Sequence, residues 1–223
     1  MAGNGAKSAE TTAPNDFHKV ANTAWSQADA AEKYANAENA TRPFARIMVE
    51  KSGLPSSLSS SQEGKEVYNV FDLATGTGAA IQELYDAVPR EKWGQLKVLG
   101  GDLSAPMLAY LSKRGEKQGW GGLETRVVDG NNIKESGIGA DGDDKYTHIF
   151  LGFAIFGMPT VLPTLHSLLN PGGFVGVTTW TSLPWYDVLA RSIGQIKGEP
   201  SVPGQKELEG KMFAGRAWGE DVS

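Results

Sequence analysis

Short apolar runs alternate with amphipathic stretches through the middle of the chain. The apolar runs have the length and residue types of buried strands, and five are predicted as strands: 67–72, 96–101, 125–128, 146–150 and 174–179. The stretches between them place apolar residues at helical spacing, and they predict helices over 79–87, 105–116 and 160–169. This alternation predicts an α/β fold, Rossmann-like and doubly wound around a mostly parallel sheet.

The regions on either side of this core favour helix. Residues 17–36 are rich in Ala, and Pro43 is a suitable first-turn residue for a second helix over 43–51. Residues 54–65 are rich in Ser and Gly and predict a surface loop. Two further helical stretches are expected after the last strand, one to about residue 196 and one over 206–216.

The chain therefore divides into four parts that form one domain of ordinary size. Residues 1–16 are polar or small and are expected to be a disordered tail. The other three parts are a helical segment, a Rossmann-like core and a C-terminal helical segment, at 17–53, 66–180 and 181–223.

Composition excludes several classes of function. The formal net charge of −5 and the lack of a basic run argue against nucleic acid and against an anionic membrane as partners. No stretch has the length of a membrane span or the apolar core of a signal peptide, so a cytoplasmic protein is expected. The absence of Cys removes disulfides and thiolate sites, and the three scattered His lack metal-ligand spacing, so no metal is expected.

The turn after the first predicted strand is the most specific feature. Asp72 is followed by small residues with Gly76 and Gly78, a pattern that lets a backbone approach a nucleotide-like ligand. A dinucleotide motif would have a third small residue where this chain has Ile81, and a P-loop would have a Lys after the second Gly. A carboxylate at position 72 repels phosphate and attracts a cation. The simpler alternative is an ordinary strand-to-helix loop.

Two more acids follow predicted strands. Asp102 is placed where two carboxylate oxygens can accept hydrogen bonds from ribose hydroxyls, and Asp129 can accept from an adenine amine. Met107 either covers the adenine face or packs in the core. For each acid the alternative is a solvated turn residue, which is the commoner case for Asp102 taken alone but not once it is paired with the glycine-rich turn.

These segments resemble class I S-adenosylmethionine (SAM) methyltransferases, and more narrowly fungal natural-product enzymes of the gliotoxin thiol methyltransferase and ubiquinone/menaquinone-biosynthesis types. The resemblance rests on 72–78, 101–108 and the Pro-Gly-Gly turn at 169–173, with Gly119-Trp120, 146–148, 178–180 and Trp185 for the fungal group. It implies SAM as cofactor, with contacts from Asp72, Ala74, Gly76, Gly78, Asp102, Leu103, Met107, Asp129, Gly130 and Asn131.

The resemblance also implies how the acceptor is bound. The segment 152–156 should form the floor between cofactor and acceptor, and the N-terminal helices, with Trp25 and Tyr34, should form a lid. The substrate pocket is expected to be walled by Trp25, Phe153, Phe156, Trp180 and Trp185. These aromatics are equally suited to simple packing. No catalytic base is assigned, since His148 falls inside a strand and His166 on a helix.

The sequence thus predicts methyl transfer from SAM to a small-molecule acceptor, a secondary metabolite methylated on S, N or O. The alternative is a SAM-fold partner subunit, regulator or substrate-shaping protein without methyl transfer. Ile81 and Asp72 disfavour a nicotinamide oxidoreductase. The class I sheet usually continues with two more strands, which are not evident before Ser223. Either the chain is a fragment, or a partner in a homo- or hetero-oligomer completes the sheet edge.

Overall fold

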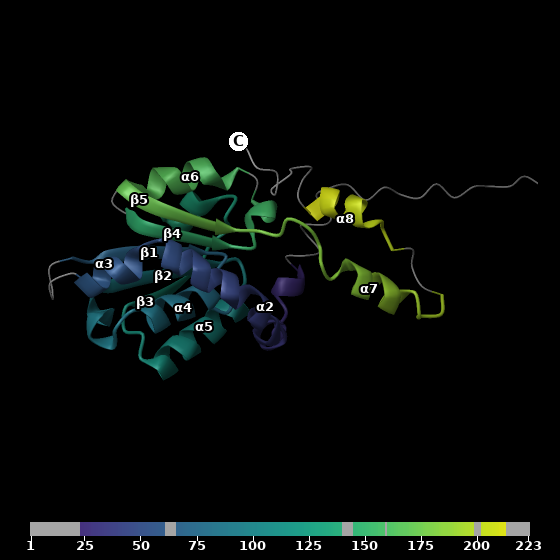
Figure 1. Cartoon of the computed structure of the whole chain (residues 1–223), viewed down its shortest axis with the longest axis horizontal. Coiled ribbons are helices and arrows are strands. Elements are labelled where there is room, and N and C mark those ends of the chain that lie inside the picture. The colour runs from purple at the N-terminus through teal and green to yellow at the C-terminus, as the bar shows by residue number, and fades with distance from the viewer. Residues whose placement is uncertain (1–22, 61–65, 140–144, 159, 199–201, 213–223) are drawn as a thin grey trace, which may run out of the picture.

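The fold is built on one parallel sheet. The computed structural model describes residues 23–60, 66–139, 145–158, 160–198 and 202–212, so the predicted tail at 1–16 lies outside the described residues. The strands are β1 (Tyr68–Leu73), β2 (Leu96–Asp102), β3 (Leu123–Val127), β4 (Tyr146–Gly152) and β5 (Leu169–Thr178). They pair in the order β3-β2-β1-β4-β5, and every pair is parallel. The predicted doubly wound α/β fold is confirmed (Figure 1).

Helices cover both faces of the sheet. The α-helices are α2 (Ala30–Lys51), α3 (Leu54–Ser60), α4 (Ala79–Ala87), α5 (Ala105–Gln118), α6 (Val161–Leu168), α7 (Tyr186–Ile193) and α8 (Gln205–Met212). Short 3₁₀ helices are η1 (Arg90–Gln95), η2 (Ile133–Ser136) and η3 (Ile155–Gly157). Helices α2 to α5 pack on one face and α6 on the other, while α7 and α8 lie away from the sheet (Figure 1).

Alternation along β1 explains the two layers. Val70 belongs to the cluster under α2 to α4, whereas Phe71 and Leu73 belong to the cluster under α6. All three side chains are at most 1% exposed. A strand that is apolar on both faces is typical of a parallel sheet covered by helices on both sides.

One continuous helix replaces the two helices predicted over 17–36 and 43–51. Helix α2 runs through Pro43, which cannot donate a hydrogen bond to the preceding turn. Burial of Ala45, Met48 and Val49 against the sheet holds the following turns in place. Tertiary packing therefore outweighs the local cost of proline, and the prediction of a helix start at residue 43 was wrong.

The predicted surface loop over 54–65 was wrong in its first half. Residues 54–60 form α3, because Leu54 and Leu58 stand one helical turn apart and both are fully buried. The helix contains four serines, and this composition led to the prediction of a loop.

The Pro-Gly-Gly turn lies within β5 and does not precede it as predicted. Leu169 pairs with Tyr146 and Phe174 with His148, and the register shifts between these pairs. Residues 170–173 therefore occupy an irregular part of an edge strand, where a proline is tolerated. In the described part of the chain, the sheet ends at β5.

The strand order positions the functional site. It reverses between β1 and β4, and ligands of doubly wound sheets bind outside the carboxyl ends of strands at such a point. The acids Asp72 and Asp102 lie at the ends of β1 and β2, and Asp129 follows β3. None of the helices that the structure describes combines the length and apolar composition needed to cross a bilayer.

We expect Phe71→Ala to lower the free energy of unfolding by about 3 to 5 kcal/mol, because it leaves a cavity in a fully packed layer. The measurement is urea unfolding. Val67→Ala is the matched control, since Val67 is 51% exposed just before β1 and should cost under about 0.5 kcal/mol. Equal effects of the two variants would contradict the described packing.

Candidate cofactor and substrate site

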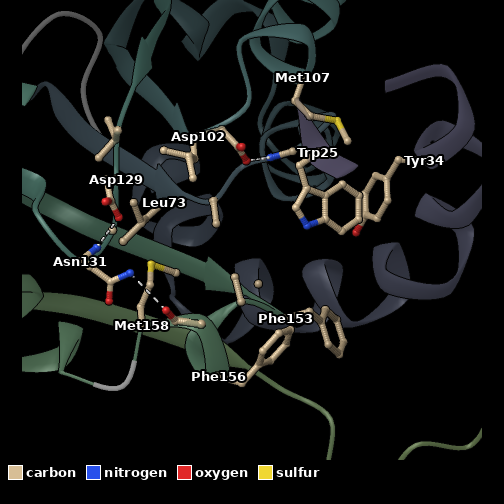
Figure 2. Close-up of a pocket in the computed structure, with 18 residues that line it drawn as sticks. Trp25, Tyr34, Leu73, Asp102, Met107, Asp129, Asn131, Phe153, Phe156 and Met158 are labelled. Carbon is tan, nitrogen blue, oxygen red and sulfur yellow. Dashed lines mark hydrogen bonds between the residues drawn. The ribbon is translucent and has the colours of Figure 1, made fainter. Parts of the chain in front are cut away.

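A cavity of about 510 Å³ opens at the carboxyl ends of the strands. Figure 2 shows Trp25, Tyr34 and Met107 on one side of it, with Phe153, Phe156 and Met158 opposite. The predicted residues that line it are Ala74, Gly76, Asp102, Leu103, Met107, Asp129, Gly130, Asn131, Trp25, Phe153 and Phe156. Asp72, Gly78, Trp180 and Trp185 do not line it. Most predicted site residues, from segments far apart in the sequence, thus lie around one cavity.

Asp102 joins the two loops that form one end of the cavity. Its Oδ2 accepts a hydrogen bond from the Gly76 N–H at 2.8 Å (Figure 2). Its Oδ1 accepts a hydrogen bond from the Ser104 N–H at 2.8 Å. Burial raises the pKa of this carboxyl, and these backbone hydrogen bonds counteract the rise. Each oxygen keeps a further lone pair with which it can accept from a ligand hydroxyl.

The glycine-rich loop is held in a left-handed backbone conformation at several points. Ala74, Gly76 and Gly78 have φ of 55°, 54° and 90°. Such a φ is strained at Ala74, and strain of this kind is concentrated at ligand sites. Gly78 precedes the first residue of α4, and a Cβ there would lie 2.4 Å from Leu111 Cδ1. Its glycine is therefore explained by packing of α4 on α5.

Asp72 lies beneath this loop, in a smaller adjoining cavity of about 50 Å³. It is 2% exposed and accepts a hydrogen bond from the Thr75 hydroxyl at 2.6 Å. Burial raises its pKa to about 7, with an opposing effect of Thr75 and a further rise from nearby Asp102. The smaller cavity shares Tyr34, Ala74, Gly76, Gly152 and Phe153 with the large one. The two cavities are therefore adjacent, with Asp72 at the inner end.

The segment after β3 forms the opposite end of the large cavity. Asp129 Oδ1 accepts from the Asn131 N–H at 2.9 Å, and Asn131 Nδ2 donates to the Gly157 carbonyl at 3.2 Å (Figure 2). The Met158 side chain packs directly over Gly130, so a Cβ at this position would require Met158 to move. These contacts hold the loop in place at this end of the cavity.

The segment predicted to form a lid, residues 17–53, contributes Trp25 and Tyr34 to the cavity wall. The Trp25 and Tyr34 rings meet edge to face with centroids 5.5 Å apart. The Ser104 hydroxyl donates to the Trp25 carbonyl at 2.5 Å, and it also accepts from the Met107 N–H as the predicted helix cap. Met107 packs against Ala30 and Ala31. The lid is thus attached to the loop that Asp102 organises.

Aromatic side chains gather at the other side of the opening. Phe153 has a φ of 54°, and its ring lies 4.5 Å from the Trp180 ring and 5.5 Å from the Phe44 ring, centroid to centroid. Trp180 therefore stands behind Phe153. Trp185 is exposed at the start of α7. Phe44, which the sequence analysis missed, is 45% exposed on α2.

The histidines stand apart from both cavities. His148 lies in β4, as predicted, and burial lowers its pKa. His166 is exposed on α6. Neither lines the large cavity or the smaller one.

Comparison with known proteins agrees with this geometry. Residues 70–173 match the family model described as methyltransferase domain. The chain is 26% identical to methyltransferase tpcH of Aspergillus fumigatus over 188 residues, which are 83% of this chain and 62% of that protein. It is 25% identical to the acetylaranotin bis-thiomethyltransferase of Aspergillus terreus over 185 residues, 83% of this chain and 60% of that protein.

Among solved structures, the DszA carbon methyltransferase shares the fold, with a TM-score of 0.53 and 16% identity over 70% of this chain and 39% of that one. The chain spans about three fifths of the length of the two Aspergillus relatives. The family match extends from β1 into β5 and includes most of the residues around the large cavity. Over residues 70–173 this chain is therefore similar to the methyltransferase domain family.

Proposed function

We propose that the chain binds SAM in the large cavity and transfers its methyl group to a small-molecule acceptor. The observation that carries the proposal is the charge of the site. Acids from the ends of β1, β2 and β3 surround the two cavities, and none of the described lining residues is Lys, Arg or His. A phosphate-bearing dinucleotide would lack a cationic side chain there, whereas a ligand with a sulfonium and an ammonium is attracted.

We propose one orientation for the adenosyl part of SAM in the large cavity, with the ribose at Asp102 and the adenine at Asp129. Asp102 would accept hydrogen bonds from the ribose hydroxyls through its remaining lone pairs. Asp129 and the backbone of Gly130 and Asn131 would contact the adenine edge, with Leu103 and Met107 beside its faces. The amino-acid end would then point toward the smaller cavity and the Asp72 carboxyl.

The acceptor would approach from the aromatic side of the opening. Phe153 and Phe156 line the cavity there, and Phe44 and Trp180 extend the apolar surface outward. The buried hydroxyls of Thr178 and Thr179 lack a hydrogen-bond partner among the described residues. Of the two, only Thr178 lines the smaller cavity, so its hydroxyl would face the amino-acid end of the cofactor. Trp185 stays a predicted substrate residue, and it lines neither cavity.

The chemistry asks little of the protein beyond alignment. SAM supplies an activated methyl group, whose bond to sulfur breaks as the acceptor bond forms, and the electron pair remains on the sulfur of S-adenosylhomocysteine. The lid and the aromatic wall would exclude water and orient the acceptor. A thiol loses its proton to solvent readily, so no dedicated base is required. One relative is named a bis-thiomethyltransferase. We therefore propose fungal secondary metabolites that carry thiols as the first acceptors to test.

We expect isothermal titration to show binding of S-adenosylhomocysteine, and Asp102→Ala to weaken it at least about tenfold through lost ribose and loop contacts. Asp187→Ala, which removes an exposed acid on α7, is the matched control and should leave the affinity unchanged. No binding to the wild-type chain would refute the proposal. Binding without transfer to any thiol, amine or hydroxyl acceptor would instead favour the non-catalytic alternative.

A second prediction follows from the raised pKa of Asp72. The folded-state pKa of about 7 exceeds the usual 3.8, so the native state holds a proton that the unfolded state has lost between these pH values. The ligand-free wild type should therefore lose stability as pH rises from about 4 to 7, by up to roughly 4 kcal/mol. Asp72→Asn should remove this part of the pH dependence in urea unfolding. Parallel stability profiles for the two proteins would contradict the assignment.

A further inference from the structure

A buried carboxylate on the lid helix contacts the glycine-rich loop. Glu38 of α2 is 6% exposed, and its Oε2 accepts a hydrogen bond from the Thr77 hydroxyl at 2.7 Å. Thr77 lies between Gly76 and Gly78 and is 1% exposed. A carboxylate at this depth is retained only with partners that offset its loss of hydration.

Arg114 of α5 supplies the compensating charge. Its guanidinium donates to both Glu38 oxygens, at 2.9 to 3.1 Å, and also to the Thr77 carbonyl at 2.9 Å. The same side chain reaches the Gln82 amide oxygen on α4 at 3.2 Å. Thr77 is therefore held through its hydroxyl and its carbonyl, and the cluster joins α2, α4, α5 and the loop.

The cluster determines where Tyr34 stands. Tyr34 is one helical turn before Glu38 on α2, so the two side chains share a face of the helix. Tyr34 lines both cavities, and its Cε1 would lie 3.6 Å from a Cβ placed on Gly76. The position of α2 relative to the loop thus fixes the space between the Tyr34 ring and the loop backbone.

We propose that Glu38 and Thr77 are positioning residues of the cofactor site, whose hydrogen bond sets the lid helix so that Tyr34 closes over the bound cofactor. The inference rests on the proposed function, because it assumes that the cofactor lies against Tyr34 and Gly76. Under this inference, Glu38 and Thr77 raise the affinity for the cofactor in addition to stabilising the fold.

The same helix offers a matched control. Arg42 and Arg46 of α2 form ion pairs with Glu83 of α4, and Arg42 also pairs with Asp86. Glu83 is 3% exposed, about as buried as Glu38, although its partners Arg42 and Arg46 are more exposed than Arg114. This second cluster joins α2 to α4, and none of its four side chains lines either cavity. If the hydrogen bond between Glu38 and Thr77 only stabilised the fold, its loss and the loss of the Glu83 ion pairs should change cofactor affinity to a similar extent.

The test is the affinity of purified variants for S-adenosylhomocysteine by isothermal titration, alongside their thermal stability. Thr77→Val keeps the shape of the side chain and leaves Glu38 paired with Arg114, so no buried charge loses its partner. It should weaken binding about fivefold, the equivalent of one hydrogen bond. Thr77→Ser, which retains the hydroxyl, should bind with an affinity within about twofold of the wild-type value. Glu83→Gln should lower the midpoint of thermal unfolding yet change the affinity less than about twofold.

A double-mutant cycle decides whether Thr77 acts through Tyr34. We expect Tyr34→Ala to weaken binding about tenfold, and Tyr34→Ala with Thr77→Val to weaken it no further. If the double variant bound about fiftyfold more weakly, the product of the two single effects, the inference would be overturned. Wild-type affinity in Thr77→Val would overturn it as well. Absence of binding by the wild-type chain would refute the proposed function and the inference with it. Wild-type binding that Thr77→Val leaves intact would refute the inference alone.

Discussion

The site depends first on one carboxylate that accepts hydrogen bonds from two loops. Asp102 holds the Gly76 N–H with one oxygen and the Ser104 N–H with the other, so the loops after β1 and β2 have a fixed separation. Ser104 in turn donates to the Trp25 carbonyl, which attaches the lid to the same centre. Without this carboxylate, no side chain of the described residues would hold the two loops and the lid together at this end of the cavity.

The parts of the site that could be predicted are those that a local pattern specifies. Apolar runs locate the strands, and carboxyl ends of parallel strands meet at one edge, so the acids at 72, 102 and 129 were expected to converge. The glycine-rich turn and the Ser104 cap are likewise local features, and both lie where the sequence placed them. The binding roles of these residues stay predictions until a ligand is seen.

The parts that could not be predicted depend on contacts between distant segments. Glu38 looks like any exposed helix acid until Arg114, far along the chain, is placed beside it. Helix α2 continues through Pro43 because its later turns are buried, a fact absent from local propensity. Phe44 was missed because its neighbours Phe153 and Trp180 come from the segments after β4 and after β5. The predicted pocket residue Trp180 is displaced outward by the same packing.

The most direct test of this account is a crystal structure of the chain with S-adenosylhomocysteine. The account predicts the ribose hydroxyls within about 2.5 to 3.2 Å of the Asp102 oxygens, the sulfur facing Phe153, and the amino group toward Asp72. A ligand bound outside the large cavity, or one whose ribose makes no contact with Asp102, would contradict it.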